Sequence, residues 1–176
     1  MTRMIALLFG LVLLVTMGAS VRINDWDGVM NYNCPPSQSI SRLQSYHRND
    51  KEDRVWDVNC KTTFGRESQP LCYETNYVNC FDEAIVFKCP PNFVISGLHS
   101  YHDNYTEDRR WRFKCCSQKG ATFNSCKWTE FLNEWDGPLK WTTPSNEFLV
   151  GVNSIHDNHK EDRRWKFQSC KMQKEE

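Results

Sequence analysis

The sequence predicts an all-β fold, in which three internal repeats of about 55 residues form one pseudo-threefold, disulfide-bridged β domain. One observation is a Glu-Asp-Arg-x-Trp motif that recurs three times, with its Trp at positions 56, 111 and 165. The other is an alternation of apolar and polar residues beside each copy, which is the period of a strand and not of a helix. A trefoil-like and a prism-like arrangement of the repeats both satisfy these observations.

Residues 1–20 have the form of a secretory signal peptide. Arg3 precedes an apolar run over residues 4–15, and small residues suited to cleavage follow at 18–20. The run is too short to cross a bilayer core, which requires roughly 20 residues. We therefore expect residues 21–176 to form a secreted domain of the extracellular space or matrix, without a membrane span.

The repeats span residues 24–60, 79–116 and 133–170. Each motif Trp lies nine residues after a histidine and 22 residues after a Cys-Pro or Thr-Pro pair, and this agreement at several positions defines the repeats. The repeated motif residues are Asp53, Arg54, Trp56, Asp108, Arg109, Trp111, Asp162, Arg163 and Trp165.

Three strands are expected in each repeat, with short polar linkers between repeats. In repeat 1, Met30 and Tyr32 mark the first strand and Ile40 and Leu43 the second, while Trp56 lies on the third. A unit of about 55 residues buries little apolar surface alone. We therefore expect the repeats to pack around one axis with their motif Trp residues in a shared core.

The spacing of the nine cysteines indicates disulfides, as expected for a secreted chain. Two pairs are 26 residues apart and two are 44 apart, although the neighbours Cys115 and Cys116 could exchange partners. Cys80 remains unpaired, and its counterparts Asp25 and Glu134 are polar, so we expect it on the surface, in a homodimer bridge or as a capped or free thiol. The expected pairs are Cys34–Cys60, Cys89–Cys115, Cys72–Cys116 and Cys126–Cys170.

The motif set resembles the dermatopontin family, and most of all its hemagglutinin/amebocyte aggregation factor branch. The resemblance rests on the three Asp-Arg-x-Trp motifs, the Cys-Pro pairs, the Asn-x-Trp-Asp-Gly segments and the Cys115-Cys116 doublet, and it covers nearly all of residues 24–170. It implies a non-enzymatic matrix or adhesion protein that binds proteoglycans, matrix proteins or cells, and agglutinates cells in some members. Cys80 is extra to the family's bridge pattern.

The motif Arg has two interpretations. Arg54 lies two residues before Trp56, on the same strand face, so a structural role requires a carboxylate partner, for which the Glu of the motif is a candidate. In the second interpretation, this Arg contacts a sugar or sulfate beside an aromatic ring. The Trp residues themselves are expected in the core.

The polar connection before each motif favours binding over catalysis. Its His, Asn, Glu and Asp recur in every repeat, whereas catalytic groups usually occupy one asymmetric pocket. The connection lacks the spacing of a known calcium loop, and the sequence shows no nucleophile motif or phosphate-binding glycine loop. We expect no enzyme activity, no metal site and no cofactor.

Basic residues on the outward face of the third strand are the candidate binding site. Alternate residues of a strand lie about 7 Å apart on one side, a spacing compatible with the sulfates or carboxylates of a polysaccharide. A solvated face balanced by nearby carboxylates is the alternative. The candidate residues are Arg110, Arg112, Lys114, Arg164 and Lys166.

Two functions follow from these features. The first is a matrix and adhesion protein that binds glycosaminoglycans, proteoglycans or other sulfated glycans and promotes cell aggregation. The alternative is a lectin-like agglutinin that recognises neutral or acidic cell-surface sugars through pockets carried by the repeats. Equal numbers of basic and acidic residues, 22 each, argue against a nucleic-acid partner. The sequon at Asn104 predicts an exposed, glycosylated loop.

Overall fold

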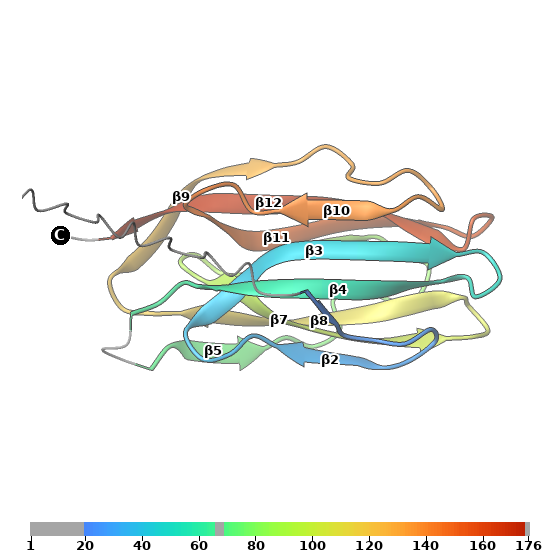
Figure 1. The fold of residues 1–176 in the computed structure, drawn as a ribbon, viewed down its shortest axis with the longest axis horizontal. Coiled ribbons are helices and arrows are strands. Elements are labelled where there is room, and N and C mark those ends of the chain that lie inside the picture. Colours follow the sequence, from blue (N-terminus) through green and yellow to red (C-terminus); the bar gives the residue numbers. More distant parts are fainter. Residues whose placement is uncertain (1–19, 66–68, 175–176) are drawn as a thin grey trace, which may run out of the picture.

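The computed structural model describes residues 20–65 and 69–174. All regular secondary structure in these ranges is β-strand (Figure 1). The expected signal peptide lies outside the described residues, except for Ser20. No helix in the described ranges could cross a bilayer. The strands are β1 (Val21–Arg22), β2 (Met30–Asn33), β3 (Gln38–Arg48), β4 (Asp53–Thr62), β5 (Leu71–Glu74), β6 (Ile85–Lys88), β7 (Val94–Asp103), β8 (Asp108–Ser117), β9 (Ala121–Trp128), β10 (Leu139–Thr142), β11 (Glu147–Asp157) and β12 (Asp162–Lys174).

The strands form three four-stranded antiparallel sheets, each built on the long hairpin of one repeat. The hairpins β3–β4, β7–β8 and β11–β12 run along the long axis of the molecule (Figure 1). Their turns share one backbone conformation, with φ of 45° at Glu52, Glu107 and Glu161. This agreement confirms the predicted all-β, pseudo-threefold class. The three sheets are compatible with both the prism-like and the trefoil-like arrangement.

Each repeat gives its first strand to the sheet of the next repeat. β2 pairs with β7, where Tyr32 lies opposite Leu98, and β6 pairs with β11. β10 of the last repeat returns to β3 of the first, where Trp141 lies opposite Leu43. The exchange closes a circle, so each repeat completes its sheet only with a strand from the repeat before it.

The segments between the repeats are more ordered than the sequence predicted. The expectation of simple polar linkers is wrong, because β5 and β9 lie in them and add the fourth strand to the sheets of β8 and β12. β5 is exposed along its whole length and β9 along its second half. Neither strand has a fully buried face, and so neither shows the alternation that marks an amphipathic strand.

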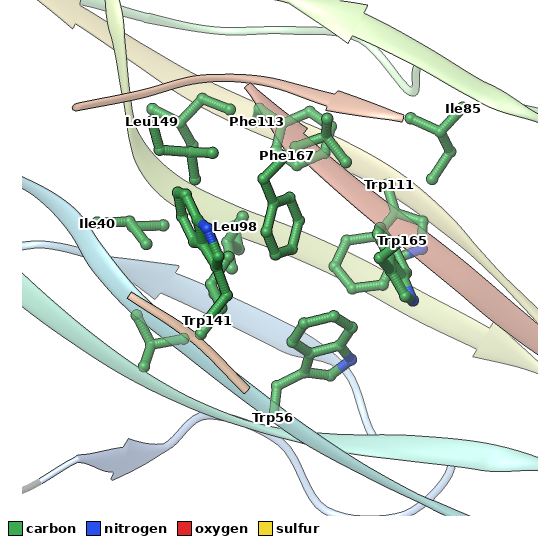
Figure 2. Packing of buried hydrophobic residues seen from close by; sticks show 14 of the residues in the cluster. Ile40, Trp56, Ile85, Leu98, Trp111, Phe113, Trp141, Leu149, Trp165 and Phe167 are labelled. Atoms are coloured by element: carbon green, nitrogen blue, oxygen red, sulfur yellow. The ribbon is translucent and has the colours of Figure 1, made fainter. Parts of the chain in front are cut away.

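The main core lies on the axis between the three sheets. Trp56, Trp111 and Trp165 meet edge to face there, with ring centroids 5.0–5.5 Å apart (Figure 2). Each ring is 2% exposed, so the structure buries the residues that the sequence assigned to the core. Phe113 and Phe167 extend the same cluster along β8 and β12.

Four disulfides join neighbouring strands and turns around this core. Two of them use the adjacent residues Cys115 and Cys116, whose side chains leave β8 in opposite directions. Cys80 is free and exposed. The bonded pairs are Cys34–Cys60, Cys72–Cys116, Cys89–Cys115 and Cys126–Cys170.

A buried asparagine at the start of each repeat fastens the incoming turn to the central strand. The Asn79 side chain donates to the carbonyl of Arg109 at 3.0 Å and accepts the backbone N–H of Trp111 at 2.9 Å. Asn24 and Asn133 make the same bonds in their own repeats. The sequence showed these asparagines only as a repeated position, because a local sequence pattern does not indicate the hydrogen-bond partners of an amide side chain.

We predict that Trp165→Ala lowers the free energy of unfolding by about 3–5 kcal/mol, because it opens a cavity between two other indole rings. Trp128→Ala is the matched control, since that ring is 41% exposed and lies outside the axial cluster. Urea unfolding followed by circular dichroism measures both changes. Equal losses in the two variants would contradict the assignment of the axial cluster as the centre of the fold.

Candidate functional site

Two outward-facing rows of basic residues run along the central strands of repeats 2 and 3. We call Arg110, Arg112 and Lys114 the β8 ladder, and Arg164 and Lys166 the β12 ladder. All five side chains are partly exposed, while the residues between them in each strand are buried in the core. The structure therefore places each candidate cation on the outer face of a sheet.

Aromatic rings from the segment before each repeat lie beneath these cations. The Arg110 guanidinium lies 4.9 Å from the ring centroid of Tyr77, and Arg112 lies 5.9 Å from the same ring. On the other sheet, Arg164 and Lys166 lie 4.5 and 4.6 Å from the ring centroid of Phe131. Such cation–π contacts hold the charges in place without neutralising them.

The cations within each ladder differ in how firmly they are held. Arg110 Nε donates to the backbone carbonyl of Asn79 at 3.0 Å, and Arg164 Nε donates to that of Asn133 at 2.9 Å. These two residues therefore also have a structural role. Arg112 and Lys166 have only side-chain contacts, so their charges can be removed with less effect on the fold.

Nearby carboxylates balance the ladders only weakly. Arg112 lies 3.7 Å from Glu74, and Lys166 lies 3.6 Å from Glu130, whose side chain is 98% exposed. Glu134, 3.3 Å from Arg164, is 83% exposed. Exposed pairs of this kind contribute little and are screened by salt, so an incoming polyanion can displace their carboxylates.

His99 lies buried beside the β8 ladder, 3.6 Å from Glu74. Burial lowers the pKa of His99, Glu74 partly offsets this, and the charges of Arg112 and Lys114 lower it further. The imidazole is therefore neutral at pH 7, and the charge of this face comes from the ladder itself.

The corresponding strand of repeat 1 carries no ladder. Val55 occupies the first position and is 2% exposed. Asp57 occupies the second and pairs with Arg22 of β1 at 3.3 Å. The basic surface thus belongs to two of the three sheets.

The repeated motif forms a closed ring of buried ion pairs between repeats. Each motif Arg binds the motif Asp of the preceding repeat with two nitrogens, at distances of 2.6–2.7 Å. All six side chains are at most 5% exposed. This Arg–Asp ring consists of Arg54 with Asp162, Arg109 with Asp53, and Arg163 with Asp108.

The structure corrects the expected partner of the motif Arg. The partner is not the Glu of the motif but the Asp of another repeat, which in the case of Arg54 lies 108 residues away. The Glu residues lie at the hairpin turns, where Glu107 and Glu161 face the histidines of their own repeats at 3.6 and 3.8 Å. A carboxylate with two oxygens in the plane of the guanidinium makes the stronger contact, and only the Asp of the neighbouring repeat reaches that position.

Two hollows lie near these groups, and neither follows a pattern of one pocket per repeat. The axial hollow, between the Arg–Asp ring and the Trp cluster, holds about 20 Å³, enough for one or two waters. The seam pocket lies between repeats 1 and 2 and holds about 330 Å³. Its walls include Pro35, Ser37, Phe64, Pro70, Ser96 and Lys114.

One group of potential metal ligands is present in the described part of the chain. Asp82, Asp108 and His156 each offer an atom within 4.8 Å of the others. Both oxygens of Asp108 already accept hydrogen bonds of 2.6 Å from Arg163. A cation at this place would have to compete with the guanidinium.

The family model for dermatopontin matches residues 24–174. The chain belongs to the dermatopontin family. This confirms the resemblance in the motifs, since the repeats lie within the matched residues. No solved structure matched the chain.

Three relatives extend this assignment. The "Hemagglutinin/amebocyte aggregation factor" of Limulus polyphemus is 47% identical over 152 residues, covering 85% of this chain and 87% of that protein. A dermatopontin of Biomphalaria glabrata is 36% identical over 141 residues, covering 80% and 93%. "Millepora cytotoxin-1" of Millepora dichotoma is 34% identical over 149 residues, covering 85% and 66%.

Two further residues predicted from the sequence lie on the surface of this dermatopontin-family fold. Cys80 follows the buried Asn79, and its backbone carbonyl, not its thiol, accepts a hydrogen bond from that side chain. Asn104 lies in the exposed β7–β8 turn beside Tyr105, which is 95% exposed. Its amide oxygen contacts His102 Nδ1 at 3.1 Å, which leaves the amide nitrogen available.

The Arg–Asp ring makes stability depend on pH. Burial works against the charged form of Asp162, but His47 and Arg54 beside it lower the pKa of this carboxyl well below its usual value. A lowered carboxyl pKa adds stability above the pKa of the unfolded chain, near 4, and this stability is lost as the pH falls towards the folded value. We predict a falling free energy of unfolding on acidification below about pH 5.

We predict that Asp162→Asn costs about 3–5 kcal/mol at pH 7, because it leaves Arg54 buried without its charged partner. Its stability should also fall less steeply in acid than that of the parent. Asp50→Asn, which removes the exposed partner of Arg48, is the control and should leave the unfolding midpoint nearly unchanged. Parallel pH profiles for Asp162→Asn and the parent would contradict a charged Asp162.

Proposed function

We propose that this chain is a secreted extracellular adhesion protein that binds sulfated glycans or proteoglycans through its basic ladders and promotes cell aggregation. The observation that carries the proposal is the pair of cation rows on β8 and β12, held over aromatic rings and only weakly balanced by exposed carboxylates. Successive cations of a row lie about 7 Å apart, a spacing compatible with the anionic groups along an extended polysaccharide.

Similarity to named relatives supports an aggregating role. The Limulus relative, 47% identical, is named a hemagglutinin and aggregation factor. Aggregation requires at least two binding surfaces that act across a gap. The ladders lie on different sheets of one chain, so a single molecule could bridge two polyanions.

The alternative of a lectin-like agglutinin, which recognises neutral or acidic sugars through pockets carried by the repeats, has one supporting observation, the seam pocket of about 330 Å³. That volume lies within the roughly 300–1,000 Å³ of small-molecule sites. Salt separates the two functions, since polyanion binding weakens steeply with ionic strength and neutral-sugar binding changes little. Matrix proteins that carry acidic glycan chains fit the first function.

We predict that Arg112→Gln combined with Lys166→Gln weakens heparin binding about tenfold at 0.15 M salt, a loss of roughly 1.4 kcal/mol. The two charges lie in separate ladders and support no backbone hydrogen bond. Isothermal titration against heparin at two salt concentrations measures the affinity and its salt dependence.

The matched control for this double variant is Arg42→Gln combined with Lys140→Gln, which removes the same charge from the outer face of the sheet that contains β3 and β10. We expect it to bind heparin nearly as the parent does. Equal losses in the two double variants would assign the binding to net charge and contradict the ladders.

We also propose that Cys80 links two chains. The exposed thiol lies in a segment whose fold depends on backbone and Asn79 contacts, so Cys80→Ser should fold normally. The parent should migrate as a reducible dimer on a non-reducing gel, and Cys80→Ser as a monomer with weaker cell aggregation, because dimerisation doubles the ladders. A monomeric parent would rule out the bridge.

Glycosylation of Asn104 is the last part of the proposal. The exposed β7–β8 turn can hold a glycan without disturbing the sheet, because the Asn104 contact to His102 uses only the amide oxygen. The ladders lie along the strand and not at its turn, so the glycan would leave them accessible.

A further inference from the structure

We propose that the seam pocket binds one anionic sugar residue, with its carboxylate or sulfate on Lys114 and a hydroxyl on Ser96. This inference rests on the proposed function and adds to it, because it assigns one specific subsite at the end of the β8 ladder.

The seam pocket is lined by rigid apolar side chains together with several polar groups. Pro35, Pro36 and Pro70 line it together with Phe64, and prolines and aromatic rings change shape little. The disulfides Cys34–Cys60 and Cys72–Cys116 fix the segments on its two sides. A preformed, mostly apolar hollow with a few polar groups is the usual form of a small-ligand site.

Ser96 supplies a polar group that lacks a partner. Ser96 is one of the residues that line the pocket, it is 3% exposed, and its Oγ is buried without a hydrogen-bond partner. A buried hydroxyl without a partner is unfavourable, and native structures usually provide one. A sugar hydroxyl can both donate to Ser96 Oγ and accept from it.

Lys114 supplies a cation that is not used elsewhere. It lies opposite Glu74 in the sheet, but Glu74 faces Arg112 at 3.7 Å and His99 at 3.6 Å. Among the described residues, Lys114 forms no ion pair. Lys114 also lines the seam pocket, so a long, flexible side chain carries a positive charge beside a ligand there.

The repeats themselves show that this cation is not required by the fold. The position of Lys114 is occupied by Asn59 in repeat 1 and by Gln168 in repeat 3. Lys114 is also the last cation of the β8 ladder, about 7 Å from Arg112 along the strand. A polysaccharide that lies on the ladder would therefore reach the pocket with one of its residues.

The test uses short ligands that fill the pocket but cannot span a ladder. A sulfated heparin disaccharide and an unsulfated hyaluronan tetrasaccharide are titrated into the full secreted chain, and their binding distinguishes sulfate from carboxylate recognition. Lys114→Gln, which copies repeat 3, should weaken binding of the preferred oligosaccharide at least tenfold. Lys140→Gln removes the same charge from an exposed position of β10, outside both ladders and the seam pocket, and should leave oligosaccharide binding unchanged.

A second variant tests the polar contact in the seam pocket independently of the Lys114 charge. Ser96→Ala keeps every charge, so it should lower the affinity for the oligosaccharide several-fold without changing the salt dependence of binding. The affinity for long heparin chains should fall less. Thermal unfolding confirms that both variants fold.

Two outcomes overturn the subsite. One is that the parent binds long heparin but neither oligosaccharide, and the other is that Lys114→Gln binds the oligosaccharide as the parent does. In both cases the ladder function survives. If the parent fails to bind long heparin as well, the proposed function itself is wrong.

Discussion

The buried pairing of each motif Arg with the Asp of the preceding repeat is the contact on which the rest of the structure depends. A guanidinium that is at most 5% exposed requires a charged partner, and the partner always comes from another repeat. The exchange of β2, β6 and β10 joins the same neighbours through backbone hydrogen bonds. Loss of one repeat would leave an Arg, an Asp and two sheet edges without partners, so the fold requires three.

The axis and the basic ladders are connected through the asparagine at the start of repeats 2 and 3. The Asn79 side chain accepts a hydrogen bond from the backbone N–H of Trp111. The backbone carbonyl of Asn79 accepts a hydrogen bond from Arg110 Nε, which lies on the outer face. Asn133 does the same for Trp165 and Arg164. The strand that buries an indole ring therefore also fixes the first cation of the ladder.

Differences between the repeats decide where basic side chains lie on this symmetric frame. In the first sheet, Val55 and Asp57 occupy the positions of the ladder cations, and Asp57 forms an ion pair with Arg22. Lys114 occurs in repeat 2, beside a pocket that lies between two repeats. The Trp, Arg–Asp and Asn contacts recur in all three copies, so the repeats differ mainly in surface residues that these contacts do not use.

The sequence determined what depends on local period and spacing. Strand alternation decided which residues face the core, and equal spacings indicated the cysteine pairs that the structure forms. Only the tertiary structure decided which repeat receives each strand, that Asp162 and not a motif Glu pairs with Arg54, and that Ser96 and Lys114 share a pocket. These contacts join residues far apart in the chain. A local pattern shows that a charge or an edge needs a partner, but the partner is fixed only when the three repeats close into one body.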